Sequence, residues 1–434
     1  MARPQRTIGG PAELTGIGLF TGAEVRLRFT PAGPDEGVAF IRTDIDGRPR
    51  VPVGVDSLAK RMRRTSLRNG TVSVETVEHV LAALSGAGID NLNIEVNGPE
   101  VPAADGSCGP FVACLQSAGI VEQDAERPAL RVTEPIAVSE GDASLVAMPS
   151  DRPELSIAFT LEYPPPIGHQ SMFFRKSEEA FAREIASCRT FVLEQEADEF
   201  KKRGLGLGAT HDNTVVYGEK GPVNSKRRFD NECVRHKVVD LIGDLFILNR
   251  DLHARVVAVK SGHHLNCRLV RLLHELVEAE ELESRVMEPV FNINDIQKIL
   301  PHRYPFLLLD RVLEIDGERR AVAIKNVTVN EPFFQGHWPN QPVMPAVLQI
   351  EAMAQLAGVL LLRKLEHTGK LAFLMSIDRA KIRRPVIPGD QLRLEAIAGR
   401  VRSRHGSVDA KAWVGNKLAS EAHIKFILVD ADAV

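Results

Sequence analysis

Three side chains that can bind a metal or move a proton recur at intervals of four in the segment VRHKVVDLIGD. If this segment is an α-helix, His236, Asp240 and Asp244 lie nearly above one another on one face. The residues around them are Val, Leu and Ile, so the face should be buried, where an unpartnered carboxylate or imidazole is costly. A histidine and an aspartate one turn apart can reach one ion. On this pair alone, a locally capped histidine and a salt-bridged aspartate are the favoured interpretation.

Two other stretches could supply the rest of a catalytic metal site. TVEHVL places Glu78 beside His79, and SGHHLN places His263 just after an expected strand. Catalytic zinc needs three protein ligands and an open position for water. It also needs a carboxylate, not bound to the metal, that takes the proton of that water. His79, His236 and Asp240 could be the ligands, and Glu78 the base.

A second group of reactive residues lies far along the chain. FFQGHWP holds His337, and Glu351 falls fourteen residues later within an apolar helix. A buried glutamate without a partner favours its protonated form, which can act as a general acid. A histidine is suited to removing a proton next to a carbonyl. The pair therefore suits elimination of water from a 3-hydroxyacyl thioester, although His337 could equally be an ordinary loop histidine.

The elements that must position these residues form three α+β blocks. Residues 1–127 show strand-like alternation around one expected helix, 71–88, and residues 128–285 repeat this mixture. The similarity of these two blocks hints at a duplication, although no sequence repeat supports it. In residues 291–434 one long apolar helix, 345–362, precedes a run of strands, which is typical of an α+β layer. The join before this block is short and charged, so we expect no long flexible tether.

Composition excludes several function classes. The 434 residues are 44% hydrophobic and 26% charged, as in ordinary globular proteins. Lys+Arg 54 against Asp+Glu 57 gives a net charge of −3, so neither nucleic acid nor an anionic membrane is expected as the main partner. We find no signal peptide, and the most apolar stretch is too short to span a bilayer. Five cysteines without a CxxC pair favour reduced thiols in the cytoplasm.

The first two blocks resemble a known enzyme family. VEHVLAAL, GIDNLNIEVNGPEVPAADGS, CRTF, RHKVVDLIGDL and KSGHHLN closely resemble the zinc-dependent UDP-3-O-acyl-N-acetylglucosamine deacetylases of lipid A synthesis, over residues 1 to about 280. The resemblance implies zinc ligands at His79, His236 and Asp240, a general base at Glu78, an oxyanion-stabilising or amine-protonating His263, and its carboxylate partner Asp244.

The same resemblance assigns further residues around the reaction. Thr190 would help to stabilise the oxyanion, and Lys237 and Phe191 would contact the substrate. Without the resemblance, Lys237 reads as a solvated surface charge and Thr190 as a helix cap or strand hydroxyl. The chain departs from the family at Phe20, where a histidine commonly follows GIGL. This departure puts in doubt an inhibitory second zinc or a local contact at that position.

The third block resembles the hot-dog 3-hydroxyacyl-[acyl-carrier-protein] dehydratases over roughly 292–434. ILPHRYPFLLLDRV, NEPFFQGHWPNQPVMPAVLQIEAMAQ and RPVIPGD carry the likeness. It implies His337 and Glu351 as a catalytic pair contributed by different subunits, and backbone N–H groups at the start of the helix facing the thioester oxygen. Ala346 replaces the usual glycine and Trp338 the usual phenylalanine, which could lower activity or narrow the acyl tunnel. A basic cluster could meet an acidic carrier protein or be a solvated strand edge: Arg379, Lys381, Arg383 and Arg384.

The leading hypothesis is therefore a fusion of a zinc deacetylase and a dehydratase. Its expected partners are a UDP-sugar lipid precursor and acyl carrier protein, and a homo-oligomer, a dimer or a trimer of dimers, is expected through the hot-dog block. Two alternatives concern the third block, which could be a hot-dog thioesterase or a non-catalytic dimerisation or docking module. For the first two blocks the rival is a structural zinc domain, although such sites are closed and usually rich in cysteine.

Overall fold

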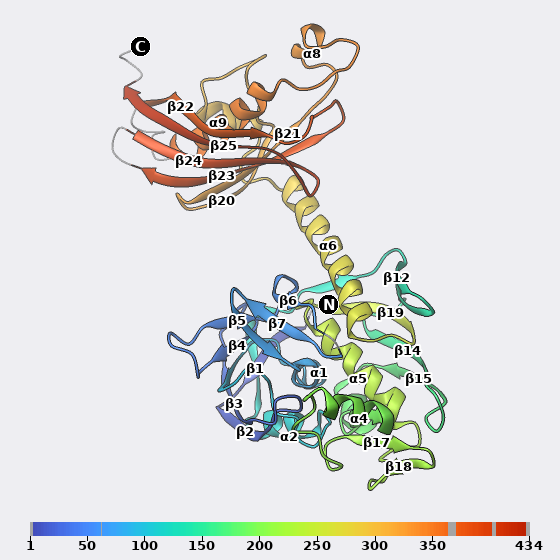
Figure 1. Cartoon of the computed structure of the whole chain (residues 1–434). Helices are drawn as coiled ribbons and strands as arrows, with labels where there is room; N and C mark the ends of the chain where they lie inside the picture. Colours follow the sequence, from blue (N-terminus) through green and yellow to red (C-terminus); the bar gives the residue numbers. More distant parts are fainter. Residues whose placement is uncertain (1–2, 62, 363–369, 402–404, 431–434) are drawn as a thin grey trace. The chain divides into compact units, whose positions relative to one another are not determined.

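The chain divides into two compact units, Met1–Val277 and Glu278–Val434 (Figure 1). The structure is a computed structural model that describes residues 3–61, 63–362, 370–401 and 405–430. Helix α6 (His263–Met287) begins in the first unit and ends in the second. No helix among the described residues is long and apolar enough to cross a membrane.

The first unit contains two sheets with the same strand order. In each sheet the third and fourth strands are parallel, and every other neighbouring pair is antiparallel. The first sheet runs β2 (Ala12–Ile17), β3 (Glu24–Pro31), β9 (Leu92–Val96), β4 (Val38–Arg42) and β5 (Arg50–Pro52). The second runs β12 (Ile136–Glu140), β13 (Ala143–Met148), β19 (Asp251–Val259), β14 (Leu155–Glu162) and β15 (His169–Arg175), and β11 (Ala129–Arg131) also pairs with β19. This shared order is the structural sign of a duplication.

Each repeat also carries an insertion at the same point, before its central helix. In the first repeat the small sheet β6 (Leu58–Ala59), β7 (Ser66–Asn69) and β8 (Val72–Glu75) precedes α1 (Glu78–Ala87). In the second repeat α3, α4 and a small sheet precede α5 (Glu232–Phe246): α3 (Glu178–Glu184), β16 (Phe191–Leu193), α4 (Glu194–Lys202), β17 (Val215–Gly218) and β18 (Gly221–Val223). The remaining elements of this unit are β1 (Pro4–Ile8), η1 (Val55–Ser57), α2 (Gly109–Ser117) and β10 (Ile120–Glu126).

One expectation for this unit is wrong: the helix expected over 71–88 begins only at Glu78. Residues Val72–Glu75 form β8, which pairs with β7 in a hairpin. The β-branched residues of TVSVETV explain the difference, because they fit a pleated strand better than a helix. The expected Gly-rich stop is present, since Gly88 caps the helix in the left-handed conformation at φ 67°.

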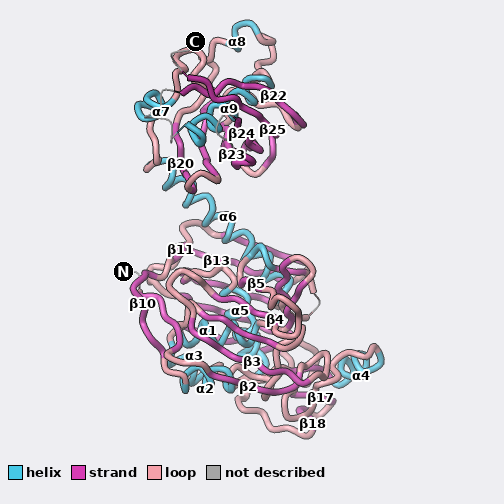
Figure 2. Tube along the Cα trace, turned by 90° about the vertical axis from the view of Figure 1, so that its left-hand side faces the viewer, coloured by secondary structure: helices cyan, strands magenta, loops and turns pink. Residues whose placement is uncertain are grey.

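Helices α1 and α5 pack against each other inside this unit, among strands that Figure 2 shows in magenta. All ten residues of α1 are buried. Gly243 of α5 permits the contact, because a Cβ added there would lie 2.1 Å from the carbonyl oxygen of Glu78. A larger residue would push the two helices apart. The close approach therefore brings the start of α1 against the C-terminal half of α5.

The second unit is one helix packed on a six-stranded antiparallel sheet, as expected for a hot-dog fold. The contacts of α9 (Ala346–Leu362) run from the second strand of the sheet to its far edge, and its residues 352–360 are all buried (Figure 1). An α-helix that is apolar on every side belongs in such a position. The sheet order is β20 (Arg311–Asp316), β21 (Arg320–Asn326), β23 (Gln391–Val401), β24 (His405–Val414), β25 (Lys417–Asp430) and β22 (Lys370–Ile382), with short helices α7 (Ile293–Ile299) and α8 (Phe333–Gly336) outside it.

Candidate active sites

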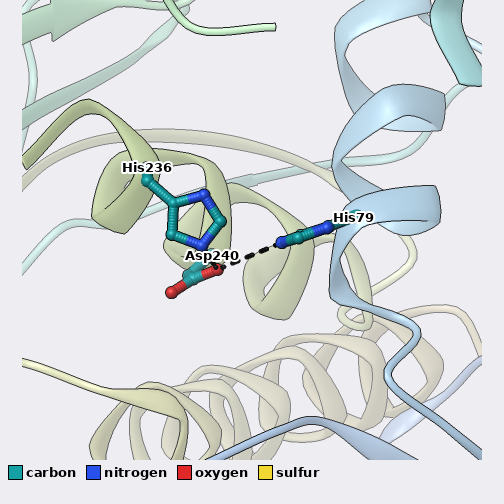
Figure 3. A group of neighbouring side chains, drawn as sticks. All are labelled: His79, His236 and Asp240. Carbon is teal, nitrogen blue, oxygen red and sulfur yellow. Dashed lines mark ion pairs between the residues drawn. The ribbon is translucent and has the colours of Figure 1, made fainter. Parts of the chain in front are cut away.

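His79, His236 and Asp240 lie together where α1 meets α5 (Figure 3). One potential ligand atom from each residue lies within 4.8 Å of the other two, and all three residues are buried. Nε2 of His236 is 3.2 Å from Oδ1 of Asp240, and Nε2 of His79 is 3.8 Å from the same oxygen. Two imidazoles and one carboxylate that point at a common centre form a donor set that a divalent cation can occupy.

The charge states of these residues suit a cation. Burial and the nearby His236 ring lower the pKa of His79 to about 3, so its imidazole is neutral and keeps a lone pair. Burial alone would raise the pKa of Asp240, but His236 and Lys237 outweigh it and hold that pKa well below its ordinary value. The carboxyl of Asp240 is therefore ionised. Metal binding needs neutral histidine and ionised carboxylate, and the site offers both.

The third polar residue of the α5 face, Asp244, serves an imidazole. Its Oδ2 lies 2.9 Å from Nδ1 of His263, the first residue of α6, and accepts a hydrogen bond from Asn266 at 2.8 Å. Its Oδ1 accepts a hydrogen bond from the hydroxyl of Thr65. Burial alone would lower the pKa of His263, but the carboxylates of Asp244 and Asp240 outweigh it and raise the pKa to about 9. His263 is therefore an imidazolium at neutral pH.

Glu78, the first residue of α1, lies beside this imidazolium, which is also 3.7 Å from Oδ2 of Asp240. Its Oε1 is 3.9 Å from Nε2 of His263, and its Oε2 accepts a hydrogen bond from the backbone N–H of Thr65 at 3.0 Å. Burial raises the pKa of Glu78 to about 7, because the attraction of His263 only partly offsets it. A carboxyl with such a pKa can take up and release a proton near neutrality.

The three candidate metal ligands, Glu78 and His263 lie in the wall of a cavity of about 850 Å³. Thr190, Phe191 and Lys237 also line it, so it brings together every residue that the sequence assigned to the deacetylase apart from Asp244. Lys237 is not a solvated surface charge, since its ammonium lies 2.9 Å from Oδ2 of Asp240. Apolar side chains cover another part of the wall: Leu19, Phe20, Leu161, Val192, Ala197, Phe200 and Leu205. The cavity can hold a ligand with both polar and long apolar parts.

Phe20 lies in this wall, in a loop fixed by a buried carboxylate. The backbone N–H of Phe20 donates to Oε1 of Glu100 at 2.9 Å, and the guanidinium of Arg64 lies 4.1 Å from the centre of the Phe20 ring. The position therefore makes an apolar and cation–π contact and offers no metal donor.

The two reactive residues of the second unit do not meet within the described chain. No described hydrogen bond or ion pair joins His337 to Glu351. His337 places its Nδ1 2.8 Å from the carbonyl oxygen of Val343 and stacks on Trp338. Glu351 is not the buried, unpartnered glutamate that the sequence indicated, because its side chain is 20% exposed and contacts two polar side chains.

The sequence analysis did not identify these two partners of Glu351. Gln355 donates to Oε1 of Glu351 at 2.9 Å, and Nε2 of His302 lies 3.7 Å from the same oxygen. Gln355 follows Glu351 by four residues, so helical spacing could have identified it. His302 belongs to the segment ILPHRYPF, but its distance from Glu351 in the sequence gave no signal. In the basic cluster, Arg383 pairs with Glu421 at 2.5 Å and Arg379 with Asp409 at 3.3 Å.

Comparison with known proteins gives matches for both units. A family model described as UDP-3-O-acyl N-acetylglycosamine deacetylase (LpxC) matches residues 5–275, and one described as a FabA-like domain matches residues 300–423. The bifunctional enzyme LpxC/FabZ of Chlorobaculum tepidum is 39% identical over 455 aligned positions, which cover 97% of each chain. Its namesake in Porphyromonas gingivalis is 35% identical and covers 96% of this chain and 97% of its own. The UDP-3-O-acyl-N-acetylglucosamine deacetylase of Thermosynechococcus vestitus is 40% identical and covers 63% of this chain and 95% of its own.

Proposed function

The chain belongs to the family of bifunctional LpxC/FabZ enzymes, and from this premise we propose which residues carry the two reactions. The first unit is the deacetylase, which removes the N-acetyl group of a UDP-3-O-(3-hydroxyacyl)-N-acetylglucosamine in lipid A synthesis. The second unit is the dehydratase, which converts 3-hydroxyacyl-carrier-protein to the trans-2-enoyl form.

The convergence of His79, His236 and Asp240 on one centre is the observation that carries the deacetylase proposal. We assign these residues as ligands of Zn²⁺. When bound, the ion would supply a Lewis acid that polarises the amide carbonyl and makes a water molecule acidic near neutral pH. The rest of the wall would hold the substrate, with Lys237 at its polar part and Phe191 at its apolar part.

The surrounding residues would move the protons. The carboxylate of Glu78 accepts a proton from the attacking water, which its pKa of about 7 permits. The imidazolium of His263, held by Asp244, donates a proton to the amine nitrogen as the C–N bond breaks. The hydroxyl of Thr190 donates a hydrogen bond to the amide oxygen as negative charge develops there.

Chelation tests the metal assignment. Treatment with a strong chelator should abolish deacetylation without unfolding the protein, and one equivalent of Zn²⁺ should restore the rate. A structural zinc domain would instead lose its circular-dichroism spectrum with the metal. A protein that stays fully active without bound metal would refute the proposal.

For the dehydratase we propose His337 as the base and Glu351 as the acid. The carbonyl oxygen of Val343 accepts the Nδ1–H of His337, which leaves the lone pair of Nε2 to remove the α-proton of the thioester. The electrons of that C–H bond form the new double bond, and the β-hydroxyl leaves as water with a proton from Glu351. Ala346 begins α9, and its backbone N–H is among those that would face the thioester oxygen.

Because His337 and Glu351 are not joined within one described chain, we propose that two copies of the chain supply one site. The edge strand β22 supports this proposal, since it carries exposed apolar side chains that pairing with a second copy would cover: Phe373, Leu374, Met375 and Ile377. The dimer could assemble further into a trimer of dimers.

Mixing two inactive variants tests the shared site. Equal amounts of His337→Ala and Glu351→Gln, denatured and refolded together, should recover about one quarter of the native dehydratase rate, since half of the dimers would hold one intact site. No recovery in mixed dimers would contradict the proposal. Release of free thiol without enoyl product would favour the thioesterase, and full activity of His337→Ala would favour the non-catalytic module.

We also propose the docking surface, the cellular compartment and the domain bounds that the sequence predicts. Acyl carrier protein would dock on the basic cluster, and both reactions would take place in the cytoplasm. The deacetylase would comprise subdomains 1–127 and 128–285, followed by the dehydratase domain 291–434. The shared strand order of the two repeats supports the first division.

A further inference from the structure

A single peptide group lies between two residues of α5. Its carbonyl, from Cys188, is 3.2 Å from Nδ1 of His236, and its N–H, from Arg189, donates to Oε1 of Glu232 at 3.1 Å. Glu232 and His236 are one helical turn apart on the same face. Carboxylate, peptide and imidazole thus form a continuous chain of hydrogen bonds that ends at the ring whose Nε2 faces Asp240.

Glu232 is too deeply buried to be an incidental contact. It is 1% exposed and Arg189 is 6% exposed, and their side chains form a two-pronged ion pair at 3.0 and 3.2 Å. The backbone N–H of Arg228 donates to the other carboxylate oxygen at 2.8 Å. A buried ion pair is tolerated when its remaining groups are bonded as well. Here the guanidinium also donates to Ser225 and to the carbonyl of Lys226.

This arrangement has an electronic consequence for the imidazole. A negative charge beside the N–H of a peptide polarises the group and makes its carbonyl a stronger acceptor. That carbonyl accepts the Nδ1–H of His236, which fixes the tautomer whose lone pair is on Nε2. Carboxylates bonded directly to metal-binding histidines orient the ring and raise its basicity in this way. In this chain one peptide group separates the carboxylate of Glu232 from the imidazole of His236.

We propose that Glu232 is a positioning residue for the metal ligand His236 and acts through the Cys188–Arg189 peptide. The inference rests on the proposed function, because it presumes that His236 binds the ion. It goes beyond that function by assigning a further residue of α5, outside the cavity wall, to metal affinity. The competing explanation is purely structural, with the Arg189–Glu232 pair only anchoring the loop before Thr190.

The test compares two variants that weaken the same ion pair. Glu232→Gln keeps the shape and removes the charge that polarises the peptide, so the affinity for Zn²⁺ should fall on the order of 10–100-fold. Arg189→Lys keeps that carboxylate and loses the forked contact, so it should lower the melting temperature but change the Zn²⁺ affinity less than about twofold. Competition with a chromophoric chelator measures affinity, and the Co²⁺ absorption spectrum should shift only in Glu232→Gln.

Asp44→Asn is the matched control. It breaks the Arg42–Asp44 pair at the end of β4, with contacts of 2.7 and 2.8 Å, and should leave the Zn²⁺ affinity unchanged. Should Glu232→Gln not fold, Glu232→Asp, which withdraws the carboxylate from the peptide, replaces it with the same expectation.

The outcomes separate the two proposals. Equal losses of affinity in Glu232→Gln and Arg189→Lys, or no loss in either, would overturn the role of Glu232. Failure of the native chain itself to bind Zn²⁺ would instead refute the proposed deacetylase site.

Discussion

The two units hold their reactive residues in opposite ways. In the first, four ionisable groups from two helices and the start of a third shift one another's pKa values and converge on one cavity: Glu78, His79, Asp240 and His263. In the second, His337 and Glu351 are partly exposed and are joined by no described contact. Burial within one core therefore sets the charge states of the first site, whereas the charge states of the second site would depend on the proposed pairing of two copies.

Loss of a proposed metal ligand should distinguish the activities of the two units most clearly. His79→Ala removes one of three donors, so deacetylation should fall to background. Dehydration should keep the native rate, because its proposed residues belong to another unit with its own core. Both rates are measured on one sample with known metal content. A parallel loss of both activities would contradict the independence of the two sites.

Glu78→Gln should have the next largest effect. Removing the general base should lower kcat for deacetylation by roughly 10²–10⁴-fold with the metal content unchanged. Glu13→Gln, on the exposed face of β2, is the control and should behave like the native protein. A native rate in Glu78→Gln would remove Glu78 from the mechanism.

The pH profile of deacetylation tests the charge states. In the proposed mechanism Glu78 acts as a carboxylate, so the rate should rise as the pH increases toward about 7. A bound cation favours the carboxylate form, so it would move this acidic limb of the profile to lower pH. His263 acts as an imidazolium, so the rate should fall as the pH rises through about 9. His263→Gln should abolish the alkaline limb. An alkaline limb that persists in this variant would assign it to another group.

The smallest expected effect belongs to Thr65→Val. This change removes the hydroxyl that donates to Asp244 while keeping the volume, so the free energy of unfolding should fall by about 1.5–3 kcal/mol. The dehydratase unit should melt as before, as differential scanning calorimetry would show. Thr15→Val, exposed on β2, is the control. An unchanged unfolding of the first unit would mean that the Thr65 bond contributes little.

Much of this site could be predicted from local sequence spacing. Helical periodicity placed His236, Asp240 and Asp244 on one face, and the structure finds that face buried with a partner for each. The same reasoning began α1 too early in the chain. The spacing of apolar residues did not distinguish the helix from the strand Val72–Glu75, which ends a hairpin before it.

Contacts made by backbone atoms, or between residues far apart in the sequence, could not be predicted from local spacing. The Cys188–Arg189 peptide that links Glu232 to His236 could have belonged to any pair of residues, since only its backbone atoms take part. The contact of His302 with Glu351 joins residues 49 positions apart. The duplication itself shows in strand order and not in residue identity, because a topology constrains which positions are buried and leaves their side chains free to vary.

The equal strand order of the two repeats has a consequence for folding. One repeat contributes His79 and the other contributes His236 and Asp240, so neither repeat alone holds all three candidate ligands. An ion that binds only the folded pair adds its binding free energy to the cohesion of both halves at once. A metal held by the proposed ligands would therefore also join the two repeats, and we expect both repeats of the metal-loaded protein to unfold together.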